Sequence, residues 1–159
     1  MSLKTKLMDD LKASMKNGDK VRLSVVRNIQ SNMKYREIEE RTKAADPADK
    51  RTPEQKDDDL ILSVVKTLVK QRKDSIEQFK AGNRQDLVDQ ESAELKCLES
   101  YLPQQMGKEQ LEAIVAKIIA STGASSAKDM GNVMKAVLAE TKGAADGKMV
   151  SELVKAKLQ

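Results

Sequence analysis

Residues 52–82 have the sequence TPEQKDDDLILSVVKTLVKQRKDSIEQFKAG, and this stretch decides the fold class. Thr52 can cap a helix, Pro53 fits its first position, and Gln55 completes a capping box. Apolar side chains then recur every three or four residues, which places them on one face of a helix. They are Ile61, Val64, Val65, Leu68, Ile76 and Phe79. Because Gly82 supplies a stop, the stretch predicts one long helix.

The sequence before this stretch predicts two helices. Ser2 can cap the first and Asp19 the second, with Gly18 between them. Each has an apolar stripe that is expected to face the core. The stripes contain Leu3, Leu7, Leu11 and Met15, then Leu23, Val26, Ile29 and Met33. Residues 41–51 contain no apolar side chain larger than alanine and predict a mobile linker.

The sequence after Gly82 predicts four more helices. One spans about residues 84–102, and three short ones follow with brief glycine-containing turns. Gly131 lies inside the second short helix, where we expect it to let another helix approach closely. The short helices begin near Gly107, Ser126 and Asp146.

No run of residues alternates apolar and polar side chains as a strand does. We therefore expect an all-α fold of about seven helices. Long-helix hairpins form an N-terminal subdomain over residues 1–92, and a compact three-helix bundle occupies residues 93–159.

The composition excludes most kinds of catalytic site. The chain has no histidine and no tryptophan. It therefore lacks the side chain that most often activates a nucleophile or holds a metal near neutral pH. Cys97 has no imidazole to lower its pKa, so we expect a structural thiol. No glycine-rich phosphate loop occurs. The sequence thus predicts no catalytic residue, no metal and no cofactor.

The location is predicted from what the chain lacks. A single cysteine cannot form an internal disulfide, so nothing implies an oxidising compartment. Residues 1–7 lack the apolar segment of a secretory signal peptide. The longest apolar runs are far too short to cross a bilayer. We expect a cytoplasmic protein without membrane contact.

Two arginines fall on apolar helix faces. Arg72 lies on the same arc as the apolar residues of the long helix, and Arg22 lies between Val26 and Ile29 on its own helix. A guanidinium in such a place extends to solvent, pairs with a carboxylate, or faces an anion-binding groove. The sequence leaves open whether each arginine forms a structural ion pair or an anion site.

Lys66, Lys70 and Lys73 recur at steps of four and three, on one edge of the long helix. Together with Arg72 they could contact the phosphates of a nucleic acid. The alternative is an ordinary solvated face, because Asp74 and nearby acids dilute the charge. The whole chain has a net charge of only +4.

Three consecutive acids, Asp57, Asp58 and Asp59, raise the question of a metal site. Consecutive residues of a helix point about 100° apart, so the three carboxylates cannot converge on one cation unaided. Acids in the first turns of a helix favour its dipole instead. We therefore propose no metal there.

Three stretches together resemble the YqeY family of bacterial proteins. The first is residues 2–27. The second contains KQRKDSIEQF (residues 70–79) and then residues 91–103. The third contains DMGNVM (residues 129–134), ADGK (residues 145–148) and LVK (residues 153–155). The last third also resembles the carboxy-terminal tail of GatB, a subunit of the glutamine-dependent aminoacyl-tRNA amidotransferase.

The resemblance implies two helical subdomains and a kinship with carbon–nitrogen ligation in which glutamine donates the amide. In GatB the helical tail helps to hold the tRNA, while amide transfer occurs in other domains. The resemblance therefore does not imply that this chain is an enzyme. The family's usual Gly-Arg-Ala-Asp-Gly turn has Ala144 here in place of arginine.

These observations predict an accessory helical module that binds tRNA or docks on a tRNA-handling enzyme. The alternative is a protein–protein adaptor with no nucleic-acid contact, which would offer an apolar groove to its partner. The sequence assigns no oligomeric state. The candidate RNA-binding or anion-binding residues are Lys66, Lys70, Arg72, Lys73, Lys142, Lys148 and Lys155.

Overall fold

The computed structural model describes residues 1–43, 46–142 and 144–158. Within these ranges it contains seven α-helices, one short 3-10 helix and no strand, which confirms the all-α prediction. Part of the predicted linker, residues 44–45, lies outside the described residues. The helices are α1 (Leu3–Asn17), α2 (Lys20–Arg41), α3 (Pro53–Ala81), α4 (Gln85–Glu99), α5 (Lys108–Thr122), η1 (Ala127–Asp129), α6 (Met130–Thr141) and α7 (Gly147–Lys157).

Helix ends follow the capping residues of the sequence. The Thr52 hydroxyl accepts the backbone N–H of Gln55 at 3.2 Å, and the Gln55 side chain accepts the backbone N–H of Thr52 at 2.9 Å. This reciprocal pair satisfies two N–H groups that the first turn of α3 leaves free. Gly18 closes α1 with a φ of +68°, a conformation that costs glycine little.

The chain divides into two compact units, Met1–Tyr101 and Leu102–Gln159. In the structure residue 92 lies inside α4, which packs against α3 in the first unit. The sequence-based division between residues 92 and 93 stays a prediction about domains.

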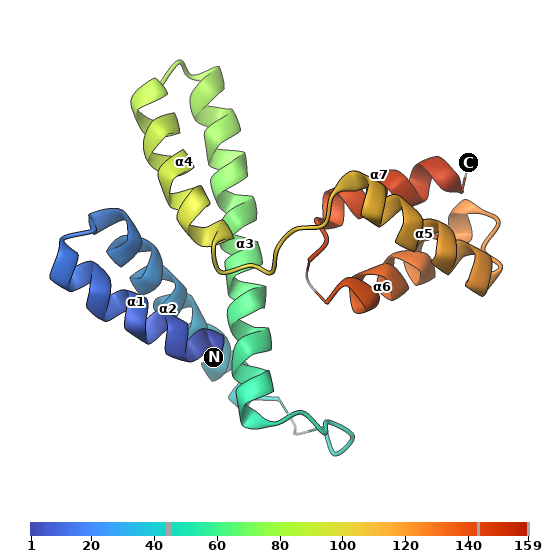
Figure 1. Ribbon diagram of the computed structural model, residues 1–159, viewed down its shortest axis with the longest axis horizontal. Helices are drawn as coiled ribbons and strands as arrows, with labels where there is room; N and C mark the ends of the chain where they lie inside the picture. The colour runs from blue at the N-terminus through green and yellow to red at the C-terminus, as the bar shows by residue number, and fades with distance from the viewer. Residues whose placement is uncertain (44–45, 143, 159) are drawn as a thin grey trace. The chain divides into compact units, whose positions relative to one another are not determined.

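The first unit consists of two helical hairpins, α1 with α2 and α3 with α4 (Figure 1). Helix α2 also contacts both α3 and α4, so its inner face joins the hairpins. The apolar side chains between the two hairpins form a core, and their removal from water is the main stabilising contribution to the unit. The core contains Leu7, Val25, Val26, Ile29, Ile61, Val64, Val65, Leu68, Val88 and Leu98.

The second unit is a three-helix bundle in which α5, α6 and α7 all contact one another. The backbone N–H of Met106 donates to the carbonyl of Ala144 at 2.8 Å, which ties the entry to α5 to the turn before α7. Its core contains Leu111, Val115, Ile118, Val133, Val137, Val150, Leu153 and Val154.

Three local predictions were wrong. Met15 was expected in the core, but it is 52% exposed. Residues spaced by four drift by about 40° per step around a helix, so a stripe that begins at Leu3 leaves the buried face by Met15. Helix α4 ends at Glu99, earlier than expected, where the Ser100 hydroxyl donates to the Cys97 carbonyl. A Cβ at Gly131 would have no neighbour within 4 Å, so no helix of the described residues packs closely against it.

Candidate nucleic-acid interface

Arg72 lies between α3 and α4 and pairs with two glutamates of α4. Its guanidinium is 2.8 Å from Glu94 Oε2 and 3.4 Å from Glu91 Oε2. The side chains are largely buried, with exposed fractions of 22%, 11% and 16% for Arg72, Glu94 and Glu91. The geometry matches the structural alternative, because both carboxylates approach the arginine inside the hairpin. An RNA contact by Arg72 stays a prediction.

Arg22 also pairs with carboxylates. It lies 3.3 Å from Asp10 of α1 and 3.7 Å from Asp19, which caps its own helix. Asp10 in turn accepts the Tyr101 hydroxyl at 2.6 Å. The network links α1, α2 and the segment after α4, so Arg22 contributes to the packing of the first unit.

The predicted lysines of α3 lie on its outer side. Lys66 and Lys70 are exposed, and within the described part of the chain neither has an ion pair. Lys73 is exposed as well, and its ammonium group lies 3.8 Å from Glu99 of α4. The structure thus places all three on α3, while part of the charge of Lys73 is offset by a neighbouring helix.

The predicted lysines of the second unit lie around α7. Lys142 ends α6 with a φ of +46° and is exposed. Lys148 lies in the first turn of α7, and Lys155 lies seven residues later on the same face. All three are exposed, and the described residues hold no ion pair to any of them. Gly143, in the turn that the sequence singled out, lies outside the described residues.

Ala144 occupies the position at which the resemblance led us to expect an arginine. Its side chain is buried, with 9% exposed, and its carbonyl accepts the Met106 N–H. In this chain the turn therefore contributes packing there and offers no charge. The cations near the turn are Lys142 and Lys148.

The three consecutive acids point to three different partners. Asp57 pairs with Lys4 at 2.8 Å, Asp58 accepts the backbone N–H of Leu3 at 2.8 Å, and Asp59 pairs with Arg51 at 2.9 Å. Among the residues that the structure describes, no group of three or more Cys, Asp or Glu side chains could hold a metal ion. The acids fasten α1 and the segment before α3 to the long helix.

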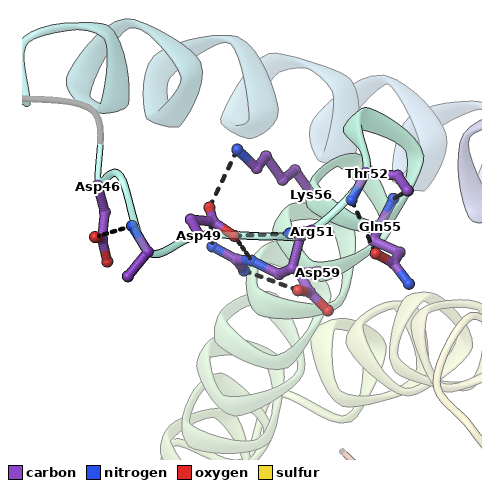
Figure 2. A network of polar contacts seen from close by, with 8 residues as sticks. Asp46, Asp49, Arg51, Thr52, Gln55, Lys56 and Asp59 are labelled. Atoms are coloured by element: carbon purple, nitrogen blue, oxygen red, sulfur yellow. Dashed lines mark hydrogen bonds and ion pairs between the residues drawn. The ribbon is translucent and has the colours of Figure 1, made fainter.

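An ion-pair network orders the approach to α3 (Figure 2). Asp49 lies 2.9 Å from the Arg51 side chain and 3.1 Å from Lys56, and Arg51 also reaches Asp59. Hydrogen bonds from Arg51, from its side chain first and then its backbone, hold the pKa of the Asp49 carboxyl well below its usual range. The end of the predicted linker is thus attached to the first turns of α3.

The sequence matches one known protein family over nearly its whole length. The Yqey-like protein family matches residues 4–158. The chain belongs to this family. Its fold is therefore that of a YqeY-like protein along nearly its whole length.

Several curated relatives share the name "Altered inheritance of mitochondria protein 41, mitochondrial". The relative from Kluyveromyces lactis is 34% identical over 116 residues, which cover 71% of this chain and 56% of the relative. That from Lachancea thermotolerans is 34% identical over 62% of this chain and 46% of its own length. The relative from Pyrenophora tritici-repentis is 29% identical over 94% of this chain and 77% of its own. The chain thus spans about half the length of the first two.

The names of these relatives contradict the predicted cytoplasmic location, which was wrong. The prediction rested on a single cysteine and on the lack of an apolar segment in residues 1–7, which was taken to mean no secretory signal. Neither observation distinguishes the cytosol from the interior of a mitochondrion, because both are reached without that signal. None of the described helices of the YqeY-like chain has the length and hydropathy needed to cross a membrane.

Sequence reasoning gave no role to Tyr101, which the structure places in the core of the first YqeY-like unit. It is 2% exposed, and the Lys6 ammonium lies 5.0 Å from its ring centre. Burial first, and then its hydrogen bond to Asp10, raises the pKa of the Tyr101 hydroxyl far above its ordinary value. A tyrosine at the end of a helix with no acid beside it in sequence gives no signal of this long-range bond.

We expect the Tyr101→Phe variant of the YqeY-like chain to lose about 2 kcal/mol of unfolding free energy at neutral pH, because a hydrogen bond to a charged carboxylate is removed. The unfolded tyrosine ionises near pH 10, whereas the folded one keeps its proton. The folded state therefore binds more protons above about pH 10, and the stability of the unmodified chain falls there as pH rises. The stability of the Tyr101→Phe variant should fall less steeply with pH in this range.

Denaturant unfolding at neutral pH measures the first effect. A series from about pH 8 to pH 11 measures the second, which centres on the pKa of an unfolded tyrosine. Tyr35→Phe is the matched control, because Tyr35 is 71% exposed. If the unfolding free energy falls with pH equally steeply in the Tyr101→Phe variant and in the control, the raised pKa of Tyr101 is contradicted.

A shallow groove lies between α1 and α2. Leu7 and Met33 form its floor, and Met8, which is 50% exposed, lies at its edge. The groove has a volume of about 300 Å³, and Lys4, Gln30, Lys34 and Glu37 complete its lining. This surface was missed because Met8 lies outside the stripe that the sequence analysis followed.

Proposed function

We propose that this YqeY-like chain is an accessory helical module that binds RNA, with tRNA as the expected class. Its lysines contact phosphate, so the shape of the RNA is recognised in preference to its base sequence. The proposal includes no catalysis by this chain. The resemblance to the tail of GatB supports tRNA as the ligand, because in that enzyme the tail holds the tRNA while other domains transfer the amide.

The observation that carries the proposal is the set of uncompensated lysines around α7. Lys142, Lys148 and Lys155 are exposed, and none has an ion pair within the described residues. Lys148 and Lys155 are about 10.5 Å apart along one face of the helix. Cations that are free of internal acids can neutralise phosphates and release counterions, which gives an affinity that depends steeply on salt.

We expect labelled tRNA to bind the chain with an affinity that falls as salt rises. The salt slope is the slope of log affinity against log salt concentration. In the triple variant that combines Lys142→Gln, Lys148→Gln and Lys155→Gln, it should decrease in magnitude by about three, one for each phosphate contact removed. The matched control is Lys108→Gln, Lys128→Gln, Lys135→Gln, which removes three other exposed lysines of the same unit. Affinity that is absent, or flat across the salt series, rejects the proposal.

The α1–α2 groove favours a second candidate function. A hydrophobic floor with methionine at its edge suits an amphipathic helix of another protein, because methionine adapts to varied apolar surfaces. Such a protein–protein adaptor would retain its partner after nuclease treatment, whereas an RNA-dependent assembly would release it.

A further inference from the structure

The outward face of α2 carries a row of cations that the sequence analysis did not single out. Lys20, Arg27, Lys34 and Arg41 recur at intervals of seven residues, and all four are exposed. A straight helix drifts by about 20° per seven residues, so the row turns by about 60° from Lys20 to Arg41 and stays on one side of the helix. Since each residue rises about 1.5 Å, the row spans about 30 Å.

These cations differ from most of the other arginines of the first unit, because no ion pair to them is found among the described residues. Arg22, Arg51, Arg72 and Arg84 all pair with carboxylates. The acids of α2 lie near its end: Glu40 pairs with Lys43, and Glu37 lines the α1–α2 groove beside Lys34.

The spaces between the cations suit the close approach of a nucleic-acid backbone. Ser24 and Ser31 are exposed on the same face, and each lies between two members of the row. Their short hydroxyl side chains can donate hydrogen bonds to phosphate oxygens. Four cations over about 30 Å, with hydroxyl groups between them, complement an extended polyanion better than a single small anion.

An aromatic ring is exposed on α2 next to this row, about 100° around the helix from Lys34. Tyr35 directly follows Lys34 and is 71% exposed, although the chain has only three aromatic residues. Its neighbour one turn along the helix, Ile38, is 60% exposed. A ring held in water beside a row of cations can stack on an unpaired base, which is the arrangement of single-strand binding surfaces.

We propose that the outward face of α2 binds a single-stranded segment of RNA. Lys20, Arg27, Lys34 and Arg41 contact successive parts of its phosphate backbone, and Tyr35 stacks on one unpaired base. This inference deepens the proposed function and rests on it, because the ligand is RNA in both. It adds residues of the first unit to the lysines of α3 and α7 that were already candidates for RNA contact.

The test compares two variants with equal charge. The α2 variant combines four substitutions, Lys20→Gln, Arg27→Gln, Lys34→Gln and Arg41→Gln. The control is Lys12→Gln, Lys16→Gln, Lys80→Gln, Lys96→Gln, which removes four exposed lysines from α1, α3 and α4. Both reduce the net charge from +4 by the same amount. Circular dichroism confirms that each is folded, and fluorescence anisotropy with labelled polyuridine measures affinity across a salt series.

We expect the α2 variant to flatten the salt slope by about three, the value for four phosphates of a single strand. The control should change it much less. Tyr35→Ala should weaken polyuridine binding about tenfold, while Tyr35→Phe keeps the affinity because stacking needs only the ring. The affinity for a blunt-ended RNA duplex should not change in the Tyr35→Ala variant, because such a duplex has no unpaired base.

Three results would overturn the inference. If the unmodified chain binds RNA and the α2 variant binds equally well, the inference fails while the proposed function stands. If the unmodified chain binds no RNA, both fail. If the α2 variant and the control lose affinity equally, total charge and not this face governs binding.

Discussion

Replacing Arg72 with methionine is expected to lower the free energy of unfolding by about 3 kcal/mol, the largest effect of any single charge in the chain. The substitution leaves Glu91 and Glu94 largely buried without their common cation. The loss of a partner from a buried ion pair costs more than the pair itself contributes, since desolvation of the remaining charge is no longer offset. Methionine retains length and helix propensity, so the packing of α3 changes little.

A double-mutant cycle tests the cause. Glu94→Gln removes the nearer carboxylate, and combined with Arg72→Met it should restore part of the lost stability, because fewer buried charges lack a partner. Lys70→Met on the exposed side of α3 is the control and should change stability by less than about 0.5 kcal/mol. If stability losses from Arg72→Met and Glu94→Gln simply add, the two side chains do not interact as the structure indicates.

The second large effect is expected from Leu111→Ala, which removes a fully buried side chain from the centre of the three-helix bundle. Such truncations cost about 3 kcal/mol, partly through lost burial and partly through the cavity that remains. A unit as small as Leu102–Gln159 has little stability in reserve. We therefore expect this unit to unfold while the first unit, with its own core, stays folded.

Native-state hydrogen exchange measures the result residue by residue. Amide protection should be lost over α5, α6 and α7 and kept over α1 to α4. Leu138→Ala is the control, because Leu138 is 39% exposed on α6 and should lose little on truncation. Loss of protection throughout both units would show that they fold as one cooperative structure.

The helices and most of the core could be predicted from sequence because their causes are local. The Thr52 capping box, the glycine that ends α1 and the apolar arc of α3 each depend on residues within a few positions of one another. Such signals depend mainly on nearby residues and little on the rest of the fold. The same reasoning placed Met15 in the core, where it failed, because burial depends on which neighbouring helix covers a face.

The partners of charged side chains could not be predicted in the same way. Arg72 was recognised as unusual, but its glutamates lie on another helix, and nothing local identifies them. Tyr101 and Asp10 are 91 positions apart in the chain. The row on α2 is different, because its spacing of seven is visible in the sequence. It gains significance only with the structure, in which the four cations are exposed and have no ion pair to another described residue.

The half-buried thiol of Cys97 bears on how the protein responds to its surroundings. Burial raises its pKa, so it stays neutral where an exposed thiol begins to ionise. The chain also has no histidine. A change of one pH unit on either side of neutrality therefore leaves the surface charge almost constant. The affinity for a polyanion would fall as the concentration of potassium or magnesium rises. The same change in pH would therefore leave that affinity almost unchanged.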